Sequence, residues 1–179
     1  MSSSQQPSSF FVVFDNGISI IKQQNKQDYF HNKLYFSHII SLMEMYLYDL
    51  FVQEISTNRD ALVKLAAQDK FKSLSLKIPF LLHNTVEDFI IHTVKNFVWH
   101  RLNDVDVLYK NVLGIQFNTN AKILEKIKIR HDIVHRNGFD LHGQEKIISE
   151  TELVDCMNVI SDFVLDIEKK YAAYIQRKT

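Results

Sequence analysis

Helix and strand breakers are scarce in this chain, and their scarcity limits its fold more than any other feature. The 179 residues include only 4 glycines and 2 prolines. Neither type occurs between Gly17 and Pro79, and neither follows Gly143. A fold of many short strands needs frequent turns, whereas long helices do not. The sequence therefore predicts an all-α bundle of five to six helices.

Apolar residues recur at helical spacing in two long segments. Residues 26–56, rich in tyrosine and phenylalanine, are predicted to form a long core helix. A last amphipathic helix is predicted to begin after Ser149 or Thr151. Capping residues predict shorter helices between these two, at 61–70, from about 85 to 101, from about 104 to 114, and from 121 to an Asn-Gly stop at 137–138.

The N-terminal segment differs in pattern from the rest. Residues 10–14 and 18–21 are mostly apolar and flank Asp15-Asn16-Gly17, a common two-strand turn sequence. We therefore expect a short N-terminal β-hairpin after a flexible leader at 1–9. This gives residues 1–25 as leader and hairpin, and residues 26–179 as one helical domain.

Composition excludes several classes of protein. Apolar residues make up 46% of the chain, enough for a core without disulfides, and a single cysteine, Cys156, excludes a disulfide framework. Lysine plus arginine equals aspartate plus glutamate, at 21 each, so the chain is not a general polycation. No apolar run approaches the roughly 18 residues that span a bilayer. We expect a soluble cytoplasmic protein with no membrane partner.

The residues with chemical potential lie at the end of the predicted helix at 121–136. Arg130, His131, Asp132, His135 and Arg136 place five ionisable side chains in seven consecutive positions. Imidazole and guanidinium groups together can bind a phosphate and transfer a proton. Basic residues also outnumber acidic ones over 121–136. The simpler interpretation is a charged helix end that favours the helix dipole and binds nothing.

Helix geometry limits how these groups can meet. At about 100° per residue, His131 and His135 share one face, whereas Arg130 and His135 lie about 140° apart. One helix does not bring the arginine and the second histidine to a single point. Two copies of the helix, facing each other across a two-fold axis, would do so. We therefore expect a homodimer with the motif helices at its interface.

Residues 130–138, Arg-His-Asp-Ile-Val-His-Arg-Asn-Gly, resemble the Arg-x4–6-His signature of HEPN domains. They are especially similar to the RiboL-PSP-type branch of prokaryotic defence and toxin systems. The order of predicted helices agrees with that family over roughly 26–175. The resemblance implies a HEPN-like helical bundle and a metal-independent endoribonuclease without cofactors. It also implies a homodimer with one composite site, acting on RNA in antiviral defence or a toxin–antitoxin system, with an antitoxin or other defence protein as partner.

The same resemblance assigns roles by position. Arg130 would hold the scissile phosphate, and His135 would act as general acid or base. Supporting positions within the motif are His131, Asp132, Arg136 and Asn137. Glu44 lies inside an apolar run, where it is either a buried acid behind the site or a partly exposed helix residue.

Two alternatives stay open at this point. Many HEPN domains lack activity, so the chain is alternatively a non-catalytic module for dimerisation, RNA or nucleotide binding, or partner binding. The second alternative is a metal-dependent phosphohydrolase of the HD type. In that case His131, Asp132 and His135 would ligate a metal together with an upstream histidine, either His92 or His100.

Overall fold

The computed structural model describes residues 6–72, 74–75 and 78–178. These residues form nine helices and one isolated β-bridge, between Phe139 and Glu145, and they contain no strand. The predicted all-α class is confirmed. The helices outnumber the predicted five to six because the N-terminal segment is helical and because α4 (Asp69–Lys72) and α5 (Ile78–Leu81) add two short turns.

The chain divides into two compact units. The first comprises the residues up to Tyr46 together with those from Asn118 onward, and the second comprises residues 47–117. Helix α2 (Tyr29–Thr57) begins in the first unit and ends in the second. All residues of the predicted motif belong to the first unit.

Helix α1 (Ser9–Gln24) occupies the segment predicted as a β-hairpin, so that prediction is wrong. Phe14, Ile18 and Ile21 follow helical spacing, and all three are buried. The Ser8 side chain caps the helix by accepting a hydrogen bond of 3.1 Å from the Phe11 amide. Residues 1–5 of the predicted leader lie outside the described residues.

Gly17 explains why the Asn-Gly pair is not a turn. A Cβ atom at this position would lie only 2.6 Å from Cδ2 of Leu42 on α2. The glycine therefore lets α1 approach α2 closely. Gly17 lies within α1, and its φ angle is outside the left-handed region. The residue that predicted a turn serves helix packing instead.

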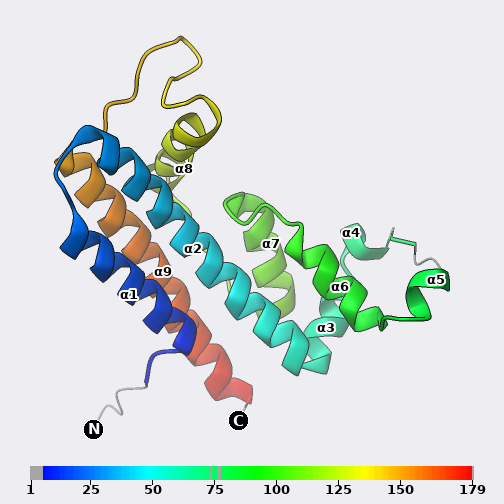
Figure 1. Cartoon of the computed structure of the whole chain (residues 1–179). Coiled ribbons are helices and arrows are strands. Elements are labelled where there is room, and N and C mark those ends of the chain that lie inside the picture. Colours follow the sequence, from blue (N-terminus) through cyan, green and yellow to red (C-terminus); the bar gives the residue numbers. More distant parts are fainter. Residues whose placement is uncertain (1–5, 73, 76–77, 179) are drawn as a thin grey trace, which may run out of the picture. The chain divides into compact units, whose positions relative to one another are not determined.

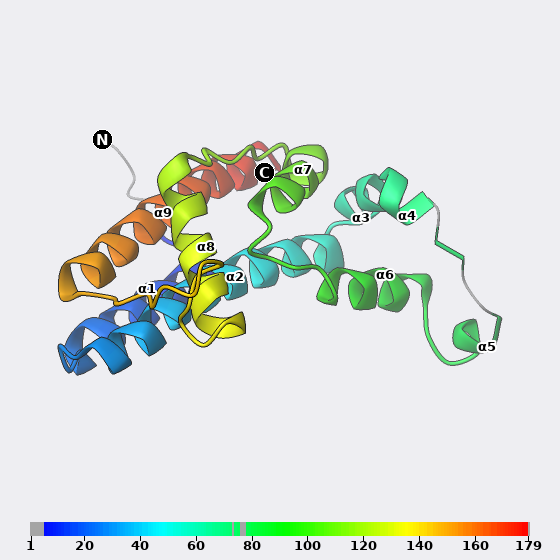
Figure 2. The ribbon, with the colours of Figure 1, turned by 90° about the horizontal axis from the view of Figure 1, so that it is seen from above.

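The first unit consists of α1, the N-terminal part of α2, α8 (Ala121–His135) and α9 (Glu150–Lys178). Helices α1, α2 and α9 run side by side, and α8 crosses them at a steep angle (Figures 1 and 2). The predicted long helices at 26–56 and after Ser149 are confirmed as α2 and α9. Their buried residues include Phe36, Ile40, Met43, Leu47, Leu153, Ile160, Val164 and Ile167.

A buried carboxylate joins three helices of this unit. Glu168 of α9 is only 7% exposed. It accepts hydrogen bonds from the Ser8 amide at 2.6 Å, from Ser8 Oγ at 2.8 Å and from the Tyr46 hydroxyl at 2.9 Å. Because all three donors are fixed by their own helices, Glu168 holds the start of α1 and the middle of α2 against α9.

The second unit has an aromatic core. Phe51 contacts the rings of Trp99 and Tyr109, and the Tyr109 hydroxyl donates to the carbonyl oxygen of Leu47 at 2.5 Å. Besides the short turns α4 and α5, its other helices are α3 (Arg59–Ala66), α6 (Val86–Lys95) and α7 (Leu102–Leu113). Asn58 and Thr85 cap α3 and α6 as expected from the sequence, although α6 ends before the predicted residue 101.

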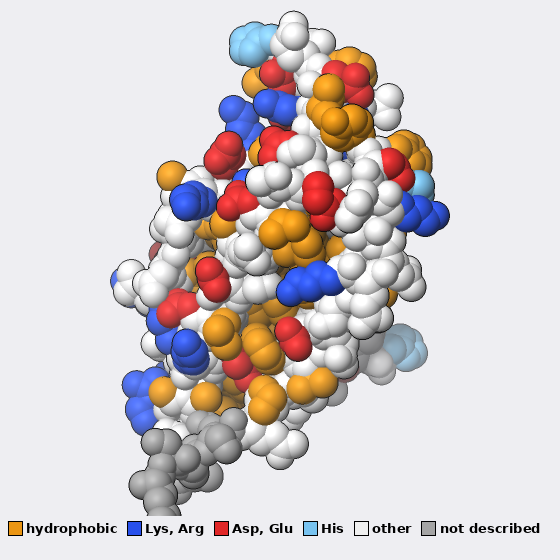
Figure 3. Space-filling view, turned by 90° about the vertical axis from the view of Figure 1, so that its left-hand side faces the viewer, with side chains coloured by type: hydrophobic (Ala, Val, Ile, Leu, Met, Phe, Trp, Pro, Cys, Tyr) orange, Lys and Arg blue, Asp and Glu red, His pale blue; other side chains and the backbone are white. Residues whose placement is uncertain are grey.

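The surface of the first unit carries charges of both signs. On the face that includes α1, apolar side chains form a band with acidic and basic side chains interspersed (Figure 3). Exposed apolar residues of α1 include Val12, Val13 and Ile20. No helix among residues 6–72, 74–75 and 78–178 is both long and apolar enough to cross a membrane.

Candidate functional site

The ends of α8 are set by local side-chain and backbone signals. Asn120 caps its start by accepting a hydrogen bond of 3.1 Å from the Ile123 amide. At the other end, Asn137 and Gly138 take left-handed φ angles of 53° and 85°. The amides of Arg136 and Gly138 both donate to the carbonyl oxygen of Asp132, each at 3.0 Å. Asparagine and glycine adopt this conformation at low cost, so the predicted helix stop is confirmed.

His131 and His135 form the exposed part of the motif. Both side chains are exposed, and their ring centroids lie 4.6 Å apart. This confirms the expectation that the two histidines share one face of the helix. The last turn of α8 therefore places two exposed imidazoles next to each other.

Arg130 is directed at α2 and is mostly buried. Its side chain is 15% exposed, and its terminal nitrogen lies 3.7 Å from Oε2 of Glu44, which is 20% exposed. That separation exceeds the usual length of an N–H···O hydrogen bond. The Nε atom of Arg130 has no acceptor among the described residues. Glu44 is thus a partly buried acid beside the motif, and it leaves donors of the guanidinium unused.

Asp132 and Arg136 are engaged with each other. The Asp132 side chain is 3% exposed, and its Oδ1 accepts from an Arg136 terminal nitrogen at 2.5 Å. A buried carboxylate needs such a partner, because an unpaired buried charge is costly. Within the chain, this contact therefore directs Asp132 at Arg136, one turn later on the helix.

The basic excess of 121–136 is largely compensated inside the first unit. Lys126 is nearly buried and forms an ion pair of 2.5 Å with Asp155 of α9. Arg130 and Arg136 lie beside Glu44 and Asp132. Lys122 and Lys128 are exposed on α8, and neither has an acidic partner within the described part of the chain. The surface of α8 is accordingly less basic than its sequence.

A metal site of the HD type finds no support in the arrangement of ligands. Across the described residues, no three His, Cys, Asp or Glu side chains are grouped closely enough to hold a metal ion. Asp132, the third member of that proposed set, is already paired with Arg136.

The loop that follows α8 contains contacts that sequence reasoning missed. Lys33 of α2 forms an ion pair of 2.7 Å with Glu145, and this lysine also lies against Gly138. Asp140 accepts the amides of His142 and Gln144, and the backbone hydrogen bonds, from Gln144 foremost, lower the pKa of the Asp140 carboxyl. Lys33 and Glu145 are 112 residues apart in the chain, so the sequence gives no signal that they form an ion pair.

Apolar side chains around the motif are unusually exposed. Val134 is 49% exposed. It points outward because Asp132 and the half-buried Ile133 occupy the inner side of this turn. Phe139 and Leu141, in the loop that follows α8, are exposed as well.

Comparisons of the chain with protein-family models, with curated proteins and with solved structures found no match. The resemblance of residues 130–138 to HEPN domains therefore stays a prediction. It depends on the motif and on the order of the helices.

Proposed function

We propose that this protein is a metal-independent endoribonuclease of the HEPN type, acting as a homodimer in the cytoplasm. The observation that carries the proposal is the pair of exposed imidazoles on the last turn of α8, with ring centroids 4.6 Å apart and Arg130 one residue before them. A role in defence or in a toxin–antitoxin system, with a protein partner, follows from the motif resemblance.

The proposed reaction is an internal transesterification of RNA. The 2′-oxygen attacks the adjacent phosphorus, its proton passes to a general base, and the bond from phosphorus to the 5′-oxygen breaks as that oxygen receives a proton. The products are a 2′,3′-cyclic phosphate and a 5′-hydroxyl. His135 supplies the acid or base function, because an imidazole can accept or donate a proton near neutral pH. His131, beside it, orients the same group.

Arg130 is proposed to hold the phosphate. Its guanidinium keeps unused donors, because Glu44 lies at 3.7 Å and Nε has no acceptor among the described residues. A planar guanidinium binds two phosphate oxygens at once, which is the geometry that a developing negative charge requires. Glu44 would then fix the direction of the arginine without neutralising all of its donors.

The homodimer is proposed for two reasons. Arg130 is directed at α2, whereas His135 is exposed at the helix end, so within one chain the two would meet only if Arg130 moved away from Glu44, and a second copy of α8 would remove that need. Exposed apolar side chains also lie within and just after the motif in the sequence, at Val134, Phe139 and Leu141. Clusters of exposed large apolar residues typically mark interaction surfaces.

A non-catalytic module is the second candidate, and a specific observation favours it. The Arg130 side chain is only 15% exposed, and the charges of Arg136 and Lys126 are already paired. A helix end that uses its charges for packing has less to offer a substrate. In that case the protein would dimerise or bind a partner or a nucleotide through the same surface, without cleaving RNA.

Incubation of the purified protein with total RNA in EDTA separates the two candidates. The proposal expects cleavage with 2′,3′-cyclic ends, a loss of 10²–10⁴ in rate for His135→Ala, and a comparable loss for Arg130→Lys. The matched controls are His92→Ala, an exposed histidine of α6, and Arg101→Lys, an exposed arginine; both should keep the parent rate. Folded parent protein that leaves RNA intact, or cleaves it equally well without His135, refutes the enzyme.

Subunit mixing tests the composite site. Arg130→Ala and His135→Ala proteins are each expected to be inactive. If one chain supplies the arginine and the other the histidine, mixed dimers regain one of the two Arg130–His135 pairs that line the composite site. Random mixing should then restore about one quarter of the parent activity. Activity of the parent without any recovery on mixing would place both residues of a working site in one chain.

A further inference from the structure

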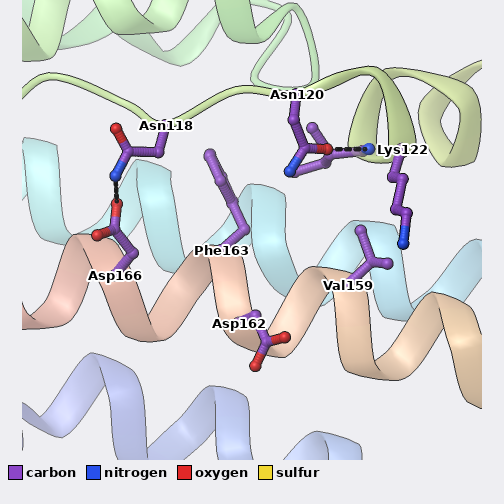
Figure 4. A pocket seen from close by; sticks show the side chains of 8 residues that line it. Asn118, Asn120, Lys122, Val159, Asp162, Phe163 and Asp166 are labelled. Carbon is purple, nitrogen blue, oxygen red and sulfur yellow. Dashed lines mark hydrogen bonds between the residues drawn. The ribbon is translucent and has the colours of Figure 1, made fainter.

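A cavity of about 370 Å³ lies in the first unit, between the start of α8 and one face of α9 (Figure 4). Its polar groups do not converge on one point. Asp166 already accepts hydrogen bonds from Asn118 at 3.1 Å and from Lys170 at 2.6 Å. The Asp162 carboxylate points away from Phe163 (Figure 4). These groups do not define one ligand, whereas the segment around α5 in the second unit has a consistent chemistry.

Helix α5 and the residue after it carry apolar side chains on two opposite sides. Ile78, Leu81 and Leu82 have the spacing i, i+3 and i+4, so they share one face of a helical turn. They are 76%, 42% and 72% exposed, and together they form what we call the outward face of α5. Phe80 lies on the other side of the turn, and its ring packs against that of Phe89 on α6, with centroids 5.6 Å apart. The anchoring of Phe80 therefore directs the other three side chains outward.

Hydrogen bonds fix this turn to the start of α6. The carbonyl oxygen of Phe80 accepts from the amides of His83 and Asn84 at 3.2 and 3.1 Å, and from Nδ2 of Asn84 at 3.1 Å. Thr85 and Asp88 then cap α6 reciprocally. Within the second unit, α5 lies at one end, beyond α6 (Figures 1 and 2). The outward face is therefore held in place at the edge of its unit.

The sequence around α5 is positively charged. Residues 70–86 include three lysines and neither aspartate nor glutamate. The Lys72 side chain is 61% exposed, and its partner Asp69, at 3.2 Å, is fully exposed, so this pair adds little and is easily exchanged. Lys70 is exposed as well, with Nζ 3.7 Å from the centre of the Phe97 ring. An anionic surface would meet lysines here and no repelling carboxylate between residues 70 and 86.

We infer that the outward face of α5, together with Lys70 and Lys72, binds reversibly to the surface of a membrane that contains anionic lipids. The three aliphatic side chains would enter the boundary between headgroups and acyl chains, and the lysines would pair with lipid phosphates. The composition favours lipid over a protein partner. Lysine is depleted in protein interfaces, and their strongest anchors are Trp, Tyr and Arg. None of these three residue types occurs in residues 70–86.

Binding of this kind needs no helix that crosses the bilayer. The expectation of no membrane partner depended on the lack of a spanning segment, and no helix of the described residues could span a bilayer. A turn that lies on the membrane surface is compatible with that finding. Three side chains form a weak anchor, so we expect an association constant of about 10⁴ M⁻¹ or below, the value for a single myristoyl chain. The binding surface belongs to the second unit and does not depend on RNA cleavage at α8.

Co-sedimentation of the full chain with lipid vesicles tests the inference. One set of vesicles contains phosphatidylcholine alone, and the other contains phosphatidylcholine and phosphatidylglycerol in equal parts. We expect the parent to bind the mixed vesicles at least about fivefold more tightly, because one lysine near an anionic surface contributes about that factor. Salt at about 1 M should remove the difference. Equal binding to the two sets at low salt, or no binding to either at about 5 mM lipid, would overturn the inference.

Matched variants then assign the binding to α5. Ile78→Asn and Leu82→Asn should each weaken binding to the mixed vesicles about tenfold. Lys72→Gln should weaken it about fivefold. The controls are Val107→Asn and Lys110→Gln, which make the same kinds of change at exposed positions of α7 and should keep the parent's affinity. Parent-like binding by both Ile78→Asn and Leu82→Asn would refute the role of the outward face.

Sedimentation without vesicles separates lipid binding from self-association. All exchanged side chains are exposed, so we expect each variant to keep the parent's circular dichroism spectrum and sedimenting mass. A lower mass for the Ile78→Asn/Leu82→Asn double variant would show that α5 contacts a second copy of the chain, and this would overturn the inference. If a variant did not fold, the comparison of the two vesicle sets on the parent would decide.

Discussion

The ion pair of Asp132 and Arg136 predicts an asymmetric cost of mutation within the motif. The Asp132 side chain is 3% exposed and that of Arg136 is 33% exposed. Arg136→Ala therefore leaves a buried carboxylate without its partner, whereas Asp132→Asn leaves a guanidinium that already contacts water. Removing one partner of a fully buried pair costs about 3–5 kcal/mol. Because water can replace part of the arginine, we expect about 2–3 kcal/mol for Arg136→Ala.

Asp132→Asn should cost less. The amide keeps the shape of the side chain and one oxygen that can accept from Arg136, so the loss is about that of one ordinary hydrogen bond, about 1 kcal/mol. The double variant should cost less than the sum of the two, because each single change breaks the same contact. For a chain of this size, 1 kcal/mol corresponds to about 2–4 °C in melting temperature.

Urea unfolding followed by far-UV circular dichroism measures these differences, with hydrogen exchange of α8 as a local readout if the two units unfold separately. Lys170→Ala is the matched control, since Lys170 pairs with Asp166 at the same four-residue spacing but with both side chains about one third exposed, at 31% and 33%. Its expected cost is below about 0.5 kcal/mol. The reasoning would be refuted if Arg136→Ala lowered the free energy of unfolding by no more than Lys170→Ala does, or by less than Asp132→Asn does.

Three further predictions concern the folded state of the first unit. Tyr46→Phe removes one donor to the buried Glu168 carboxylate and should lower the free energy of unfolding by about 1.5–3 kcal/mol in urea titrations. Burial raises the pKa of Cys156 to about 12, so its thiol should resist iodoacetamide at pH 8 in the native protein and react once urea unfolds it. The pKa of Asp140 is lowered by backbone hydrogen bonds, so the stability that it adds to its loop is complete above the unfolded value of about 3.9 and is lost as pH falls through the lower folded value. NMR of the loop amides between pH 6 and 2 should show that loss, and unchanged amide shifts would contradict it.

Helix positions were predictable wherever a local signal sets them. Asn58, Thr85 and Asn120 cap the helices that follow them, each through contacts within three residues. The stop of α8 at Asn137-Gly138 is equally local, because it depends on two residues that adopt positive φ. Such signals survive any tertiary arrangement, which is why the sequence was sufficient for them.

The N-terminal segment could not be assigned in the same way. Its apolar residues fit both a short strand, as an unbroken apolar run over 10–14, and a helical pattern through Phe14, Ile18 and Ile21. The choice is made by Leu42, against which Gly17 packs, and by Glu168, which holds Ser8. Leu42 and Glu168 are distant in the sequence from the N-terminal segment, so short-range periodicity does not reveal the contacts that decide its structure.

In the candidate site, too, local contacts were predictable from the sequence and contacts between distant segments were not. The shared face of His131 and His135 follows from helix geometry alone, and it was predicted. The pairing of Asp132 with Arg136, four residues apart on one helix, had a readable signal that was assigned to catalysis instead of to packing. The contacts of Arg130 with Glu44 and of Lys126 with Asp155 join distant segments, and spacing in the sequence does not reveal them.

These contacts narrow what the motif can do. A charge that is paired inside the chain must be released before it can serve a substrate, and release of a buried pair is costly. Asp132, Arg136 and Lys126 therefore belong to the stability of α8. His131 and His135 are exposed, and Arg130 keeps unused donors although it is directed at α2. Arg130 and His135 diverge within one chain, so joint action on one phosphate requires either a movement of Arg130 away from Glu44 or a second copy of α8.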